Sequence, residues 1–211
     1  MARDRSGGLE RGRFRGDDTR ATQDRARIAQ TAARLIAEHG LADWALAKRK
    51  AARQLMLPET TALPSNDEIE AALVAHHALF GGEAHVAGLR AQRAETLAWM
   101  KRLSAWEPLL VGGVAAGWAT VHSDARVELV ADDPKAVEMM LAGAGVFYTA
   151  VPPREDAESG GRGAELFIAT PRTGLRLSIL TPQQRRNRPR RDDEPRLTVA
   201  DVTALLAADQ G

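Results

Sequence analysis

The chain has 211 residues, enough for one full domain and a smaller one, and its 29 basic residues almost balance its 28 acidic ones. The absence of cysteine excludes a disulfide framework, a thiolate metal site and a cysteine nucleophile. No apolar run reaches membrane-spanning length and the first residues lack the apolar core of a secretory signal, so we expect a cytoplasmic protein without a membrane partner.

Residues 1–24 are rich in arginine, aspartate and glycine and contain almost no large apolar side chains. A segment of this composition cannot bury enough apolar surface to offset the entropy that it loses on ordering. The sequence therefore predicts a disordered, mildly basic arm over residues 1–24.

Residues 25–107 carry apolar side chains at helical spacing. A first stripe closes at Gly40, and a second runs through residues 44–55. Ser65-x-x-Glu68 is a capping box that opens a third helix, and a fourth, longer helix completes the region. We therefore expect a helical region over residues 25–107.

Two basic clusters stand out. Arg49, Lys50 and Arg53 project together from the second expected helix, and five arginines lie within residues 185–191, directly before three acidic residues. Each cluster is typical either of phosphate contacts along a nucleic acid or of a solvated surface. The sequence leaves both interpretations open.

Residues 108–182 alternate short apolar runs with turns, which predicts strands near 108–112, 125–130, 146–150, 165–169 and 174–180. Asp133 and Pro134 predict the start of a helix after the second strand, and residues 152–163 predict a hairpin-like loop. Residues 183–211 predict an Arg-rich linker followed by a final helix capped by Thr198. The predicted fold is α+β: an N-terminal helical region, then a small mixed β-sheet with flanking helices.

The stretch VGGVAAGWATVHSDARVEL, residues 111–129, indicates a strand, a glycine-rich turn, a short helix and a second strand. A glycine turn leaves backbone N–H groups free to face a phosphate, and the start of the following helix adds positive potential. The Ser-Asp pair at the start of the second strand suits a metal-bound nucleotide. This stretch is the strongest candidate for a functional site.

The same stretch resembles the motif of the nucleotidyltransferase superfamily of the polymerase-beta type, in its small bacterial form. That motif is an apolar strand, Gly-Ser, three residues, Gly, five residues, and then Ser-Asp-x-Asp on the next strand. Four positions of this chain match the motif: Gly112, Gly117, Ser123 and Asp124. Two depart from it, because Gly113 stands in place of the serine and Arg126 in place of the second aspartate.

The resemblance implies a nucleotidyltransferase-like domain whose carboxylates hold Mg²⁺ on a triphosphate. Residues i and i+2 of a strand share one face, so Arg126 shares its face with Asp124 and repels a cation there. Glu128 lies on the same face but ~13 Å along the strand from Asp124, too far to share one Mg²⁺. Glu165 is the only acid between residues 164 and 180. Asp124 is therefore left as a residual metal ligand.

We accordingly expect a catalytically degenerate protein that binds a nucleotide, another phosphate-bearing ligand or a partner. The expected phosphate contacts are Gly112, Gly113, Gly117, Ser123 and Arg126. One alternative is an active Mg²⁺-dependent transferase with a rearranged site that uses Asp124 and Glu128 or Glu165; Mg²⁺ is expected as a cofactor only in that case. The other alternative is a nucleic-acid-binding regulator that uses the two basic clusters.

Overall fold

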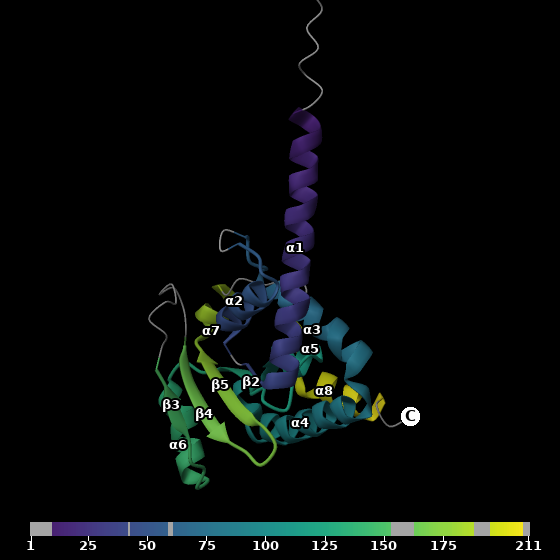
Figure 1. The fold of residues 1–211 in the computed structure, drawn as a ribbon. Helices are drawn as coiled ribbons and strands as arrows, with labels where there is room; N and C mark the ends of the chain where they lie inside the picture. Colours follow the sequence, from purple (N-terminus) through teal and green to yellow (C-terminus); the bar gives the residue numbers. More distant parts are fainter. Residues whose placement is uncertain (1–9, 42, 59–60, 153–162, 188–194, 209–211) are drawn as a thin grey trace, which may run out of the picture. The chain divides into compact units, whose positions relative to one another are not determined.

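The computed structural model describes residues 10–41, 43–58, 61–152, 163–187 and 195–208. The chain divides into two compact units, one ending at Gly81 and the other beginning at Gly82. Helices make up the described part of the first unit, and a mixed β-sheet with helices makes up the second (Figure 1). The fold is therefore α+β, as predicted.

The first unit consists of α1 (Glu10–His39), α2 (Trp44–Gln54) and α3 (Asn66–Phe80). Helix α1 packs against both of the other helices. Their shared core is built from small and branched aliphatic side chains: Ile28, Ala32, Ala33, Ile36, Ala47, Ala51, Ile69 and Leu73. These residues recur at helical spacing, and for this reason the three helices could be predicted from the sequence.

The ends of these helices follow the expected signals. Helix α1 ends before Gly40, whose φ of +64° is accessible to glycine at little cost. The predicted capping box at α3 is confirmed, because Ser65 Oγ accepts from the N–H of Glu68 while Glu68 Oε2 accepts from the N–H of Ser65. The hydrogen bond from the Ser65 backbone, more than any other contact, lowers the pKa of Glu68.

The predicted disordered arm is wrong for residues 10–24, because α1 begins at Glu10. Once a helix is anchored by a packed segment, here around Ile28, adding residues at its end requires no new nucleation. Arginine, which occurs four times in this stretch, has good helix propensity. Residues 1–9 of the predicted arm lie outside the described residues.

The second unit begins with α4 (Gly82–Arg102) and the short 3₁₀ helix η1 (Ser104–Trp106). The remaining elements are β1 (Leu109–Val111), α5 (Gly113–Ala116), β2 (Ala125–Val130), α6 (Pro134–Gly143), β3 (Thr149–Val151), β4 (Ala164–Ala169), β5 (Gly174–Leu180), α7 (Pro182–Asn187) and α8 (Val199–Ala208). The described strands form one five-stranded sheet in the order β1-β2-β5-β4-β3. Strands β2 and β5 are parallel, and every other neighbouring pair is antiparallel.

The two faces of this sheet differ in chemistry. Val127, Leu177 and Leu166 are paired across β2, β5 and β4, and all three are buried in the core that also contains apolar side chains of α4 and α6. The opposite face carries Arg126 and Arg176, which are direct partners in the β2–β5 register. The apolar face holds the unit together, which leaves the polar face available for a site.

The sequence placed α4 with the other helices, but it belongs to the second unit. Leu89, Leu97 and Met100 of α4 are buried in the same core as the strands. Periodicity identifies a helix and its apolar face but contains no information about which partner covers that face. The boundary between the units therefore lies at Gly81–Gly82, whereas the sequence predicted a boundary at 107–108.

The strand and helix starts are largely as predicted. Strands β2 and β5 have the predicted bounds, whereas β3 begins at Thr149, three residues later than expected. Asp133 and Thr198 accept hydrogen bonds from the first turns of α6 and α8.

Most of the predicted loop 152–163 lies outside the described residues. No described helix is long and apolar enough to cross a membrane.

The start of the predicted Arg-rich linker is instead helix α7. Thr181 and Gln184 exchange hydrogen bonds between side chain and backbone in the manner of a capping box, and Pro182 suits the first turn of a helix. The sequence therefore contained a helix signal that the density of arginines obscured. Residues 188–191 of the basic cluster lie outside the described residues.

We predict that Ser65→Ala lowers the free energy of unfolding by about 1 kcal/mol, because it removes the side-chain acceptor for the first turn of α3. Urea unfolding followed by far-ultraviolet circular dichroism measures the change. Ser65→Asp, which retains an N-cap acceptor, serves as the control and should stay close to wild type. Equal unfolding midpoints for Ser65→Ala and wild type would contradict the prediction.

Candidate functional site

The glycine turn after β1 is shaped by backbone conformation. Gly112 has φ +69° and Gly117 has φ +89°, and L side chains rarely adopt such angles. Gly117 closes the short helix α5 in the left-handed conformation. The two glycines that match the motif are therefore required by the path of the chain, whatever the turn binds.

Gly113 is required for a different reason. The indole ring of Trp118 lies against it, so that a Cβ at this position would be only 2.7 Å from two ring carbons. The carbonyl oxygen of Gly113 accepts hydrogen bonds from the N–H groups of Gly117, Trp118 and Ala119. The expected phosphate donor at Gly117 is thus engaged inside the turn, and the position of the superfamily's serine is closed by an aromatic ring.

Helix α4 fixes the turn from the other side. Arg93, which is 9% exposed, donates from Nε to the carbonyl of Val114 at 3.0 Å and from Nη2 to that of Ala115 at 3.3 Å. Gln92 donates to the carbonyl of Thr120 at 2.9 Å. Neither residue was predicted from the sequence; the signal that could have identified them is two long polar side chains on the apolar stripe of a helix. They act as backbone supports for the turn.

Ser123 has a role within the loop that leads to β2. Its hydroxyl oxygen accepts from the N–H of Thr120 at 2.9 Å and lies 3.3 Å from the Thr120 hydroxyl. Its carbonyl accepts from the Thr173 hydroxyl at 3.0 Å, which ties this loop to the start of β5. Both groups of Ser123 therefore hold the loop that leads to β2.

The carboxylates of Asp124 and Glu165 come together around an arginine, Arg176, and not around a metal site. Arg176 donates from Nε to Asp124 Oδ2 at 2.6 Å and from Nη1 to Glu165 Oε1 at 3.1 Å. Its guanidinium also lies 5.6 Å from the centre of the Phe167 ring. Burial lowers the pKa of Arg176, but the hydrogen bonds and charges of the two carboxylates outweigh burial and raise that pKa. The guanidinium is therefore firmly cationic and held by both acids.

Arg126 lies beside this group but, unlike Arg176, is exposed to solvent. It is the register partner of Arg176, its side chain is exposed, and it makes no ion pair or hydrogen bond with another described side chain. A Cβ on Gly112 would lie 3.4 Å from Arg126 Cδ, so the arginine extends along the glycine turn. The structure thus brings together Gly112, Arg126, Arg176, Asp124 and Glu165.

Glu128 is paired with a different arginine, which lies outside this group. It is 1% exposed, and its Oε2 lies 3.8 Å from Nη1 of Arg196, which precedes α8. The alternative in which Glu128 supplies a metal ligand beside Asp124 therefore has no support in the geometry. The carboxylate is committed to an arginine next to the edge strand β1.

The residues of this face do not fit the Mg²⁺ site that the resemblance implies. The guanidinium of Arg176 bridges the two carboxylates that converge, and Arg126 stands in place of the second aspartate. Within the part of the chain that the structure describes, no group of three or more histidine or carboxylate side chains is placed to hold a metal ion. The face instead carries two arginines, Arg126 and Arg176, at partnered register positions.

The basic face of α2 is present in the first unit. Arg49, Lys50 and Arg53 are exposed, and the helix contains no acidic residue. Lys48, at the side of this face, donates to Asn66 Oδ1 at 2.8 Å. Three cationic side chains are therefore presented to solvent by one helix.

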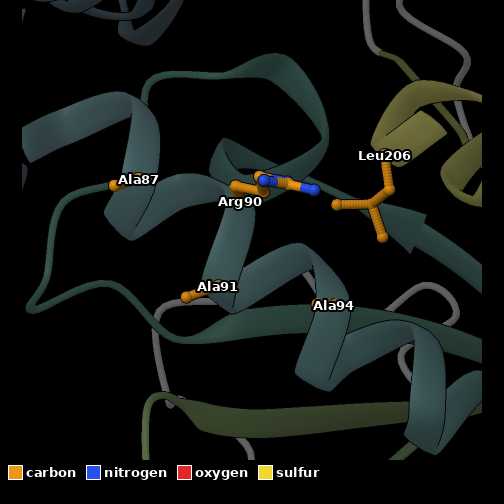
Figure 2. Close-up of a pocket in the computed structure, with 5 residues that line it drawn as sticks. All are labelled: Ala87, Arg90, Ala91, Ala94 and Leu206. Carbon is orange, nitrogen blue, oxygen red and sulfur yellow. The ribbon is translucent and has the colours of Figure 1, made fainter. Parts of the chain in front are cut away.

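A separate cavity of about 400 Å³ lies between α4 and α8. It is lined by Ala87, Arg90, Ala91, Ala94 and Leu206, and Figure 2 shows the Arg90 side chain extending toward Leu206. None of these residues belongs to the sheet or to the glycine turn. The cavity is shallow, mostly apolar and distinct from the arginine-bearing face.

Comparison with known proteins adds no relative: no protein-family model matches the chain, and no curated protein matches it. The candidate site therefore rests on its own geometry.

We predict that Gly113→Ser, which introduces the superfamily's residue, lowers the free energy of unfolding by about 1–3 kcal/mol because the new side chain meets the Trp118 ring. Urea unfolding in a Trp118→Ala background should show a smaller cost for the same serine. Gly88→Ser is the matched control, since a Cβ there meets nothing within 4 Å. An equal cost of the serine in both backgrounds would refute the assigned contact.

Proposed function

We propose that the second unit is a nucleotidyltransferase-like domain that no longer transfers nucleotides and that binds a phosphate-bearing ligand through Arg126. The observation that carries this proposal is the pair of ion pairs from Arg176 to Asp124 and Glu165. The resemblance of residues 111–129 to the superfamily motif supplies the expected location of the phosphate, beside the glycine turn.

The ion pairs argue against metal-dependent chemistry. Mg²⁺ binds carboxylate oxygens at ~2.0–2.1 Å and releases its water reluctantly. To reach Asp124 and Glu165 it would displace a guanidinium that is already paired with both, and it would then lie near two positive charges. Without the metal, nothing balances a triphosphate or holds the attacking group in line.

The presence of Arg126 in place of the motif's second aspartate favours the binding of an anion. The planar guanidinium of arginine binds phosphate through two parallel hydrogen bonds. Arg126 is exposed, and its donors make no hydrogen bond with other described side chains. Its Cδ lies beside Gly112, at the turn where the resemblance expects a phosphate, and this supports the assignment.

We predict that wild-type protein binds Mn²⁺ at least tenfold more weakly than the double variant Arg126→Asp/Arg176→Ala. The variant frees Asp124 and Glu165 and adds a third carboxylate on the same face. Electron paramagnetic resonance of free Mn²⁺ measures both affinities.

The control for this experiment is Arg102→Asp/Arg186→Ala, which makes the same change in charge at exposed arginines of α4 and α7. Mn²⁺ binding by wild type as tight as by the Arg126/Arg176 variant would contradict the loss of the metal site. Transfer of label from ATP by wild type with Mn²⁺ and cell extract, abolished by Asp124→Ala, would establish the active-transferase alternative.

A second candidate function concerns the first unit. The exposed cations of α2, with no acid on the helix, favour contacts with nucleic-acid phosphates. Replacing Arg49, Lys50 and Arg53 by alanine should then reduce the slope of log affinity against log salt concentration by about 2 to 3. Fluorescence anisotropy with labelled DNA and RNA measures this slope, and an unchanged slope would remove the candidate.

A further inference from the structure

The charges on the polar face of the sheet cancel. Arg126 and Arg176 face Asp124 and Glu165, and in the next row Glu128 is paired with Arg196. From this balance we infer that the ligand carries a single phosphate group, as in a nucleoside monophosphate or its cyclic diester, and is bound without a divalent cation. This inference rests on the proposed function and specifies its ligand.

The two arginines differ in how many N–H donors remain for a ligand. A guanidinium has five N–H donors, and Arg176 uses Nε and Nη1 for its carboxylates. Arg176 is half-buried and its charge is compensated twice, whereas Arg126 is exposed and has no ion-pair partner among the described residues. Arg126 is therefore the main phosphate contact, and the remaining donors of Arg176 contribute from the adjacent register position.

A ligand of higher charge fits this face less well. A phosphate monoester carries about −1.5 to −2 at neutral pH, and each further phosphate adds charge that Asp124 and Glu165 repel. In metal-dependent sites the added charge is neutralised by cations held by carboxylates. Here both carboxylates that converge hold Arg176 instead, and Arg126 is the arginine of this group that has no ion-pair partner among the described residues, so a ligand with one phosphate meets less repulsion than a ligand with several.

The test uses the full-length protein and three probes that share one nucleoside: cyclic AMP, AMP and ATP. Calorimetric titrations are carried out once with EDTA and once with excess Mg²⁺. We expect cyclic AMP and AMP to bind at least as tightly as ATP and Mg²⁺ to leave their Kd values unchanged. Arg126→Ala should weaken binding of both at least tenfold, whereas the exposed Arg102→Ala on α4 should not change it.

A charge-removing variant makes the test sharper. Asp124→Asn/Glu165→Gln removes both negative charges while the amide oxygens still accept from Arg176. We expect ATP to gain at least tenfold in affinity in this variant and AMP to gain less. Circular dichroism and thermal unfolding establish that the variant keeps its fold, and Asp124→Asn alone provides an intermediate step.

Each outcome separates this inference from the proposed function. ATP binding tightest in EDTA, with no gain in the double variant, overturns the single-phosphate inference but leaves a phosphate-binding face. ATP binding tightest only with Mg²⁺ overturns both the inference and the loss of the metal site. No binding of any probe at millimolar concentration, or binding that Arg126→Ala leaves unchanged, overturns the proposed function itself.

Discussion

The guanidinium of Arg176 bonds to carboxylates from both neighbouring chain segments, and the polar face of the sheet depends on this interaction. Asp124 precedes β2 and Glu165 lies on β4, so the two hydrogen bonds, at 2.6 and 3.1 Å, tie three adjacent parts of the sheet together. Without a cation between them, two carboxylates on one face would repel each other. Arginine meets this need with fixed geometry and with a charge that does not titrate at physiological pH.

The glycine turn beside this network has its own structural requirements. Gly112 and Gly117 adopt positive φ, and Gly113 accommodates the ring of Trp118. Buried polar side chains of α4, chiefly Arg93, satisfy the carbonyls of α5. A glycine pattern that resembles a phosphate-binding motif is thus compatible with a turn whose N–H groups from residues 117 to 119 are satisfied internally. The exposed side chain of Arg126, more than the backbone of the turn, is available to a ligand.

Whether a feature could be predicted from the sequence depends on how far apart in the chain its interacting residues lie. The bounds of β2 and β5, the capping box at Ser65 and the N-cap at Asp133 depend on residues close in sequence, and these predictions are confirmed. The partner of α4 and the meeting of Arg176 with Asp124 depend on residues far apart in the chain. Arg176 and Glu165 lie on strands that were predicted from the sequence, but only strand order and register bring the two residues together.

The two arginines of the polar face also depend on each other. Arg126 in place of an aspartate removes one cation ligand, yet by itself it would leave Asp124 and Glu165 without a partner for their charges. Arg176 supplies that partner, and the two carboxylates that it holds offset its repulsion of Arg126, its direct register neighbour. With both arginines present the face has no net charge but one accessible cation. The ion pairs of such a face are complete without a metal ion, and its exposed arginine is the side chain on which the proposed phosphate contact depends.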